Sequence, residues 1–225
     1  MAIMARPSSA RRTKYQFVSV LIAALAALAA LAACAGQHAT ANSTAHTATA
    51  TNDKSIGVAL LGTWQSKECE TVSQDLTRRR TYVFGKGDVA VITYNLYGSP
   101  SCNKSAKLFT LITHGAAAFV GPSTTVAGAS NVLFTFKSRA AEPTAIGVAA
   151  LKEACPQYKW APGVSVDLSQ DGCGALVQSN VQCPIEYDLA AIVSGVAFFG
   201  DRSHPLCTEA TRPTKLAVWG LVRNP

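Results

Sequence analysis

Polar and apolar residues alternate along the middle of the chain with the period of two that is typical of β-strands. Residues 81–84 and 89–97 alternate in this way on either side of a Gly85-Lys86-Gly87 turn, which predicts a hairpin. Further segments rich in Val, Ile, Thr and aromatic residues are separated by Gly, Pro and Ser, and they predict strands at 107–113, 116–120, 131–137, 164–168, 175–178, 185–193, 196–200 and 215–222. About nine or ten strands of this kind predict an antiparallel sheet, barrel or sandwich.

One segment, residues 143–154, departs from this alternation. Ile146, Ala149 and Glu153 are spaced as on one face of a helix, and Pro143 stands near the start, where proline is tolerated. The sequence therefore predicts one short helix within a mainly β chain.

The first 33 residues have the pattern of an export signal. A basic stretch without acidic residues (1–14) precedes an almost wholly apolar one (17–33), which ends in Leu31-Ala32-Ala33-Cys34. Small residues before a cysteine are typical of the lipoprotein class, so we expect cleavage after Ala33 and acylation of Cys34. An uncleaved membrane helix is the alternative, because the apolar run is near the lower limit of about 17–25 residues for a span.

Residues 35–55 are mostly Ala, Thr, Ser, Asn, Gln and His, which bury too little surface to order themselves. The chain is therefore expected to consist of a signal peptide (1–33), a lipidated cysteine with a disordered tether (34–55), and one β domain (56–225). Ala35 is not the aspartate of an inner-membrane retention signal. The predicted location is the cell envelope, on the outer membrane facing the periplasm where the cell has two membranes.

Charge and motifs exclude several classes of function. Removing the four basic residues of the signal lowers the 20 basic residues to 16, against 13 acidic ones, and this mild excess does not indicate nucleic-acid binding. The sequence contains no GxSxG, HExxH or P-loop motif, and no spacing selects a Ser, His and Asp set or a zinc site. We therefore expect neither an enzyme nor a metal or cofactor site.

Six cysteines follow Cys34, and an even number in an exported chain predicts three disulfides. Fifteen connectivities are allowed by the sequence alone. Pairing in sequence order is preferred, which joins Cys69 to Cys102, Cys155 to Cys173, and Cys183 to Cys207.

Short motifs in a shared order across residues 60–223 resemble the APCDD domain, named for the adenomatosis-polyposis-coli-down-regulated proteins. The motifs are Leu61-Gly62-Thr63-Trp64-Gln65-Ser66, Cys69-Glu70, Leu76-Thr77-Arg78, Tyr82, Phe84, Tyr94, Tyr97, Ser99-Pro100-Ser101-Cys102, Cys155, Trp160, Gly163, Asp167, Gly172-Cys173, Glu186-Tyr187-Asp188, Phe199-Gly200-Asp201-Arg202 and Arg212-Pro213. The resemblance implies an antiparallel, lipocalin-like β-barrel of about nine or ten strands with one short helix.

Animal members of that family are membrane-anchored antagonists of Wnt signalling, thought to hold the acyl chain of a lipidated ligand in an apolar pocket. This chain has one copy of the domain where they have two, and its predicted anchor is a lipid instead of a transmembrane helix. A Wnt partner is therefore not expected. The resemblance implies only an apolar ligand, such as a fatty acid (palmitate, for example), a lipid or an acylated compound.

Candidate side chains for such a pocket are the aromatic residues of the predicted strands, which are equally interpretable as plain core: Trp64, Tyr82, Phe84, Tyr94, Phe109, Phe134, Phe136 and Phe198. Arg78 is a candidate for meeting a ligand carboxylate, although an ion pair with Glu68 or Glu70 is the preferred interpretation.

Two functions follow from these patterns. The first is an envelope lipoprotein that binds an apolar small molecule in a barrel pocket, since a barrel of about eight strands holds either side chains or one small ligand. The second is a protein-binding or structural module with a filled barrel, for example a hydrolase inhibitor. The interior discriminates between them, and the alanines in 89–91 and 116–118 favour the first.

Overall fold

The computed structural model describes residues 53–224, with side chains from Ile56 onward. The predicted signal peptide, Cys34 and most of the predicted tether lie outside these residues. Helix α2 (Asp53–Leu60), which no pattern predicted, begins within the last residues assigned to the tether.

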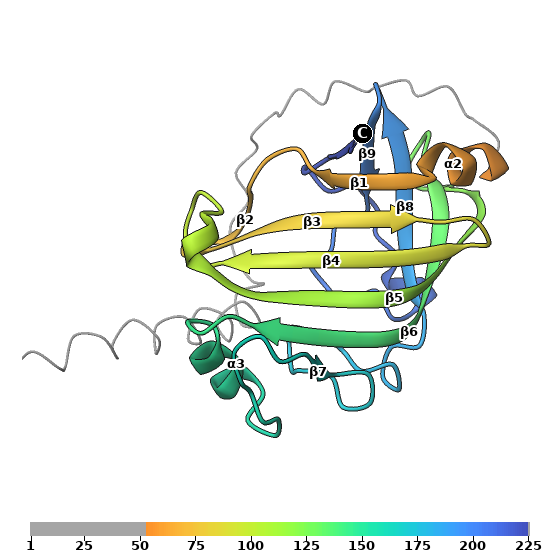
Figure 1. The fold of residues 1–225 in the computed structure, drawn as a ribbon. Coiled ribbons are helices and arrows are strands. Elements are labelled where there is room, and N and C mark those ends of the chain that lie inside the picture. The colour runs from red at the N-terminus through yellow and green to blue at the C-terminus, as the bar shows by residue number, and fades with distance from the viewer. Residues whose placement is uncertain (1–52, 225) are drawn as a thin grey trace, which may run out of the picture. The chain divides into compact units, whose positions relative to one another are not determined.

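Eight strands close an antiparallel barrel (Figure 1). Around the barrel they follow the order β1, β10, β9, β8, β6, β5, β4 and β3, and β3 pairs back onto β1. Their bounds in chain order are β1 (Gly62–Ser66), β3 (Leu76–Phe84), β4 (Val89–Tyr97), β5 (Lys107–Pro122), β6 (Ser130–Pro143), β8 (Glu186–Val193), β9 (Val196–Phe199) and β10 (Leu221–Arg223). The short strands β2 (Glu70–Ser73) and β7 (Val166–Asp167) lie outside the closed path and pair with β3 and β6. The predicted β-barrel is thus confirmed.

The longest hairpin consists of β5 and β6. The strands predicted at 107–113 and 116–120 are one continuous strand in the structure, β5. A bulge between His114 and Gly115 carries β5 past the point where the alternation breaks. Gly115 is required there, because a Cβ would collide with the backbone of Thr135 on β6. The bulge bends the strand around the barrel without ending it.

The predicted helix is shorter than expected, because α3 spans Val148–Ala154 and Pro143 is instead the last residue of β6. Two predicted strands are mainly loop. In 175–178 only Val177 pairs, with Cys173, and 215–222 enters the barrel only at β10. Backbone hydrogen bonds outside a strand ladder order both segments, from Cys173 to Val177 in the first and from Ala217 to Phe199 in the second.

The three disulfides join the cysteines in sequence order, Cys69 to Cys102, Cys155 to Cys173, and Cys183 to Cys207, as predicted. The first ties the start of β2 to the loop after β4, and the second ties the end of α3 to the loop after β7. The third joins the loop before β8 to the loop after β9. All three therefore fix connections and leave the barrel wall to hydrogen bonds.

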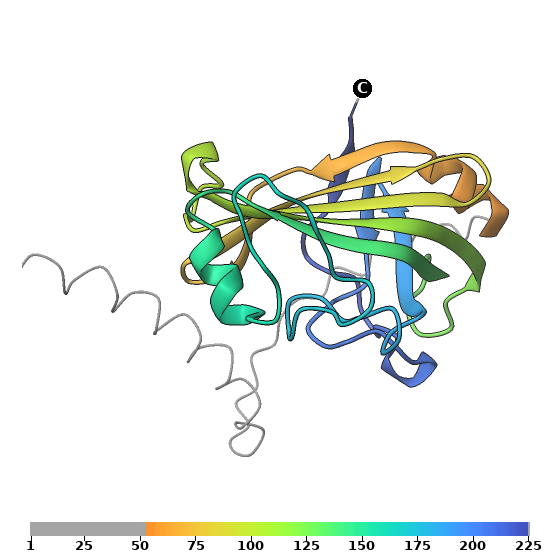
Figure 2. The same ribbon diagram turned by 60° about the horizontal axis from the view of Figure 1, so that its bottom comes forward.

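Two apolar clusters occupy opposite parts of the domain. The first lies inside the barrel next to α2 and includes Trp64, Phe134 and Phe199. The second lies where the ends of β4, β5 and β6 meet α3 and the chain that follows it, and includes Leu151 and Trp160. Figure 2 shows α3 and this following chain lying against the long strands.

Candidate functional site

Most aromatic candidates fill the barrel instead of lining a hollow. Trp64, Tyr82, Phe84, Phe134 and Phe136 are all buried in the first apolar cluster. Their rings pack on one another, as in the stacked pair of Phe134 and Phe136 at 5.8 Å between centroids. Such interlocked rings stabilise the fold beyond the area they bury.

A further ring at the centre of this cluster was not among the candidates. Phe199, at the end of β9, lies 4.5 Å from Tyr82 between centroids and also contacts Phe84 and Phe134. The candidate Phe198 is its neighbour in the strand and is only half-buried. Alternation alone leaves open which of two adjacent phenylalanines points inward. Phe109 lies in the second cluster, near α3.

A cleft of about 420 Å³ opens at the end of the barrel that α2 partly covers. Its lining comes from α2, from the turn between β3 and β4, and from β5: Gly57, Val58, Leu61, Phe84, Gly85, Lys86, Gly87, Asp88, Val89, Ala117 and Phe119. Phe84 is the one predicted ligand-binding residue that reaches it. The walls are mainly apolar, while Lys86 and Asp88 provide charges on the turn.

Local sequence explains how this cleft forms. Gly57 lets α2 approach β5, because a Cβ at that position would stand 3.0 Å from the ring of Phe119. The turn between β3 and β4 needs positive φ angles at Gly87 and Asp88, which are 72° and 61°. Helix and turn are thereby held on opposite sides of the opening, with Ala117 between them as a small residue of the wall.

Between the two apolar clusters lies a group of charged and phenolic side chains, which we call the polar layer: Glu70, Arg78, Arg80, Tyr94, Arg139, Glu186, Asp188 and Arg202. Tyr94 belongs to it and packs against both clusters. Inward-facing charges on strands are costly to bury unless they are paired and hydrogen-bonded.

One half of the polar layer centres on Glu70. Its carboxylate accepts a 2.7 Å hydrogen bond from Nε of Arg80 and a 2.9 Å hydrogen bond from Nε of Arg78. Arg78 thus pairs with Glu70, in agreement with the preferred interpretation of the sequence, while Glu68 is exposed. Register explains the arrangement, because Arg78 lies opposite Glu70 across β2 and β3 and Arg79 faces the other side.

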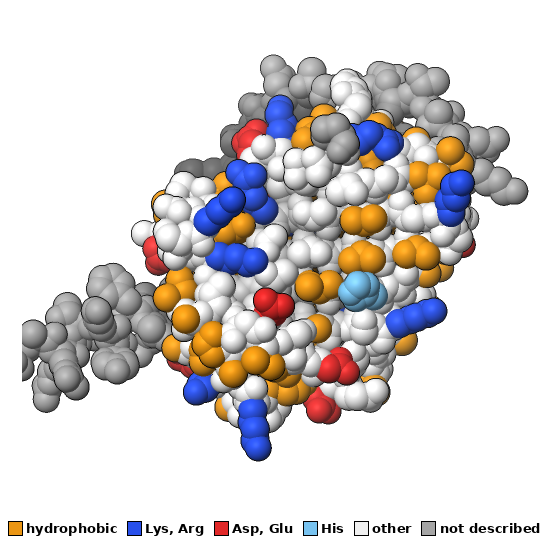
Figure 3. Space-filling model, viewed as in Figure 1, with side chains coloured by type: hydrophobic (Ala, Val, Ile, Leu, Met, Phe, Trp, Pro, Cys, Tyr) orange, Lys and Arg blue, Asp and Glu red, His pale blue; other side chains and the backbone are white. Residues whose placement is uncertain are grey.

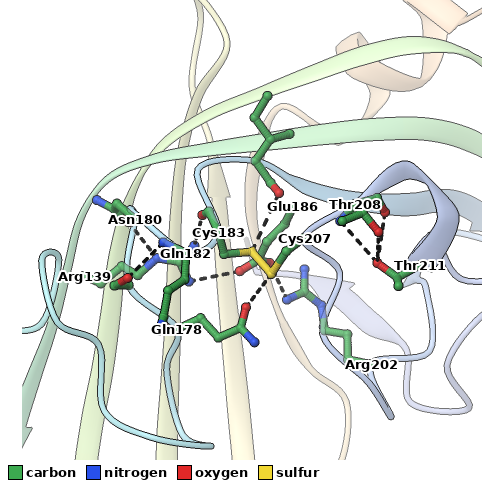
Figure 4. The surroundings of a disulfide bond; sticks show 12 residues. Arg139, Gln178, Asn180, Gln182, Cys183, Glu186, Arg202, Cys207, Thr208 and Thr211 are labelled. Carbon is green, nitrogen blue, oxygen red and sulfur yellow. Dashed lines mark hydrogen bonds and ion pairs between the residues drawn. A yellow bond between two sulfur atoms is a disulfide. The ribbon is translucent and has the colours of Figure 1, made fainter.

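The other half centres on Arg202, which follows β9. Its Nη1 donates to Glu186 at 2.8 Å and its Nη2 donates to Asp188 at 2.6 Å. Nη1 of Arg139 reaches the second oxygen of Glu186 at 3.0 Å. Figure 4 shows Arg139, Glu186 and Arg202 beside the disulfide between Cys183 and Cys207, which ties the loop after β9 to the loop before β8.

Burial and charge compete in setting the ionisation of these groups. Burial alone would raise the pKa of Glu186, but Arg202 and Arg139 outweigh it and hold this pKa below the usual 4.5. Burial raises the pKa of Tyr82 far above its usual value of 10, and the neighbouring Tyr94 adds to the rise. Burial would lower the pKa of Arg202, yet the oxygens of Tyr94 and Asp188 outweigh it and raise this pKa well above its usual value.

The phenols of Tyr82 and Tyr94 share a 3.0 Å hydrogen bond, which links the two halves of the polar layer. The guanidinium of Arg78 stands 5.7 Å from the centre of the Tyr94 ring. Tyr94 is half-buried, and the side chain of Arg78 is 27% exposed. This part of the layer is therefore open to solvent, whereas the aromatic cluster is not.

The outer face of β3 to β6 carries no broad apolar area. Figure 3 shows apolar side chains scattered among polar ones, with Lys and Arg side chains gathered towards the end where β2 lies. Within residues 53–224, no helix is long and apolar enough to span a bilayer. The same part of the chain contains no group of three His, Cys, Asp or Glu placed to hold a metal ion.

No protein-family model matches the chain, and no curated protein matches it either. The barrel and its disulfides are established by the structure alone. Membership of the APCDD family is part of the proposal that follows.

Proposed function

We propose that this chain is an APCDD-like envelope lipoprotein that binds an apolar small molecule in the cleft beside α2. The ligand class is a fatty acid such as palmitate, another lipid, or an acylated compound. The observation that carries the proposal is the cleft itself, whose volume of about 420 Å³ falls within the range of about 300–1,000 Å³ for small-molecule pockets.

The composition of the cleft wall supports an apolar ligand. Val58, Leu61 and Val89 line the cleft. Two phenylalanines join this lining to the aromatic cluster, since Phe84 belongs to the cluster and Phe119 packs against it. Covering them with a hydrocarbon chain would remove apolar surface from water, which is favourable by roughly 25 cal/mol per Å². The filled interior moves the expected ligand from the centre of the barrel to this end.

The proposed location follows from the N-terminal sequence. The signal at 1–33 directs export, Cys34 carries the acyl groups, and more than one acyl chain gives a stable anchor. Outer-membrane placement facing the periplasm is the location we propose. We propose no catalytic activity and no nucleic-acid partner.

Native mass spectrometry and displacement of a fluorescent fatty acid test the proposed ligand. Residues 35–225 are exported into an oxidising compartment behind a signal peptide that is cleaved without lipidation, so that the protein is released without an anchor. Val58→Asp places a charge in the cleft wall at an exposed position, and Val181→Asp is the matched control at an exposed position outside the cleft. We expect the first variant to weaken fatty-acid binding at least tenfold and the control to leave it unchanged.

Two results would overturn the cleft as the site. One is the absence of any lipid adduct together with no binding of the fluorescent probe. The other is an equal loss of binding in Val58→Asp and Val181→Asp. Both variants alter exposed side chains, so a thermal melt of each serves as the check that the fold is retained.

The filled barrel supports a second candidate function, a protein-binding module such as a hydrolase inhibitor. The specific observation is the contact of Phe199 with Tyr82, Phe84 and Phe134, which occupies the interior with side chains. Under this alternative the loops carry the function, and purified protein inhibits an envelope hydrolase while binding no fatty acid.

A further inference from the structure

The charges of the polar layer do not balance. Within the described chain it contains four guanidinium groups, those of Arg78, Arg80, Arg139 and Arg202. Three carboxylates face them, those of Glu70, Glu186 and Asp188. One positive charge is in excess, and an unpaired charge in a partly desolvated site attracts a counter-ion strongly.

The excess lies on the side of Arg78. Arg80 and Arg78 share the single carboxylate of Glu70, whereas Arg202 has the carboxylates of both Glu186 and Asp188. Arg80 is fully enclosed and uses its Nη2 on the carbonyl of Trp219. Arg78 uses only Nε, so that both of its Nη groups have no hydrogen-bond acceptor among the described residues.

A second donor without a partner lies in the same layer. Nε of Arg202 is buried and finds no acceptor among the described residues, although Nη1 and Nη2 are both paired. The ring of Tyr94 lies 5.7 Å beneath the guanidinium of Arg78, its hydroxyl shares a hydrogen bond with Tyr82, and its oxygen contributes to raising the pKa of Arg202. The unpaired Nη groups and the excess positive charge of Arg78 therefore lie over one half-buried phenol.

We propose that the polar layer binds one carboxylate group beside Tyr94, with Arg78 as its principal ligand and the Tyr94 hydroxyl as the second donor. The Nη1 and Nη2 groups of an arginine form a planar fork that matches the two oxygens of a carboxylate. A single negative charge cancels the excess of the layer. This site is distinct from the apolar cleft, because none of its residues lines that cleft.

Two sources of the carboxylate are distinguished by probe. Acetate presents the group alone, and decanoate presents it on a hydrocarbon chain. The structure predicts saturable binding of acetate by calorimetry, because the guanidinium and phenol donors need no tail. Decanoate binding that Arg78→Met weakens, with no acetate binding, would assign the site to an amphiphile's headgroup, which keeps the carboxylate contact and adds a tail.

Neighbouring arginines give a matched pair of variants. Arg78→Met removes the proposed ligand, and Arg79→Met removes the same charge from the outer face of the same strand. Arg80 remains to hold Glu70 in both. We expect at least about tenfold weaker carboxylate binding in Arg78→Met and no change in Arg79→Met, since a charged hydrogen bond is lost only in the first. Tyr94→Phe, which removes one hydroxyl, is expected to weaken binding several-fold.

Binding of neither probe at millimolar concentration would overturn this site, and so would an equal loss of acetate binding in Arg78→Met and Arg79→Met. Chloride that binds as strongly as acetate would also overturn it, because the layer would then attract charge without recognising a carboxylate. Thermal melts confirm that each variant is folded. Acetate binding that is unchanged in Val58→Asp shows that this site is separate from the proposed cleft. The failure of one proposal therefore leaves the other standing.

Discussion

Nε of Arg80 donates a 2.7 Å hydrogen bond to Oε1 of Glu70 inside the barrel, where each side chain is only 1% exposed. The same guanidinium donates to the carbonyl of Trp219 at 2.8 Å, and the amide of Arg80 donates to Ser66. This one ion pair therefore connects β3, the start of β2, and the chain leading into β10. Its value to the fold depends on both partners being present, since either charge alone would be buried without compensation.

Glu70→Gln should therefore destabilise the domain strongly. It leaves Arg80 buried without a counter-charge, and such a loss costs about 3–5 kcal/mol. Glu68→Gln is the matched control, because Glu68 is exposed two positions away. Urea unfolding followed by tryptophan fluorescence measures the difference. A loss below about 1 kcal/mol would show that water reaches the pair.

Phe134→Ala should open a cavity at the centre of the barrel. The side chain is fully buried among other rings, so its removal costs about 3–5 kcal/mol in unfolding free energy. An apolar cavity of this kind takes up benzene, so benzene should raise the melting temperature of this variant but not of the wild type. Phe198→Ala, which alters the half-buried neighbour of Phe199, should show a smaller loss and no benzene effect.

Replacing Cys183 and Cys207 by serine should loosen the loop that carries Arg202. The disulfide closes 24 residues, which corresponds to roughly 3 kcal/mol of stability on the chain-entropy model. Hydrogen exchange should rise mainly in residues 200–208. Serine at both Cys69 and Cys102 provides the comparison, with faster exchange expected around β2 instead. Uniform exchange changes in both variants would contradict a local role.

Glu186 should make stability depend on acid pH. Its pKa in the folded state lies below the unfolded value of about 4.5, because Arg202 and Arg139 outweigh the effect of burial. Its contribution is therefore complete above pH 4.5 and is lost as the pH falls through the lower, folded-state pKa. The difference in unfolding free energy between wild type and Glu186→Gln should be largest near pH 7 and shrink below pH 4.5. Glu142→Gln, exposed on β6, should differ little from wild type at either pH.

Cys34 should carry a diacylglyceryl group after export. Mass spectrometry of membrane-extracted protein should show cleavage before Cys34 and the added acyl mass, whereas Cys34→Ser, which offers no thiol for acylation, should lack that mass and keep residues 1–33. An unmodified Cys34 in an uncleaved chain would support the membrane-helix alternative.

The strand pattern of the sequence was sufficient to predict the barrel but not its boundaries. Residues 89–97 alternate clearly and form β4 with the same bounds. Strand β1 went unpredicted because it is short and follows α2 after a single residue, and only its pairing with both β3 and β10 makes it a strand. Pairing of this kind depends on distant residues and leaves little signal in the local pattern.

The candidate site, like the fold, was predicted from the sequence only where its residues lie close together in the chain. Proximity in sequence indicated that Arg78 pairs with Glu68 or Glu70, and the structure shows the pair with Glu70. Nothing local indicated that Arg202, far along the chain, would enter the same polar layer. The cleft was also missed, because no pattern predicted α2 and the walls of the cleft come from three separate elements.

The seam of the barrel joins β1 to β10, from opposite ends of the described chain, with Ser66 opposite Leu221 and Trp64 opposite Arg223. Until β10 is in place, β1 and β9 each present an unsatisfied edge that another molecule can extend. A chain stopped prematurely before Leu221 would keep almost all of its core residues and still be prone to aggregate. Protection of these two strand edges therefore depends on the three residues of β10, of which only Leu221 is buried in the core.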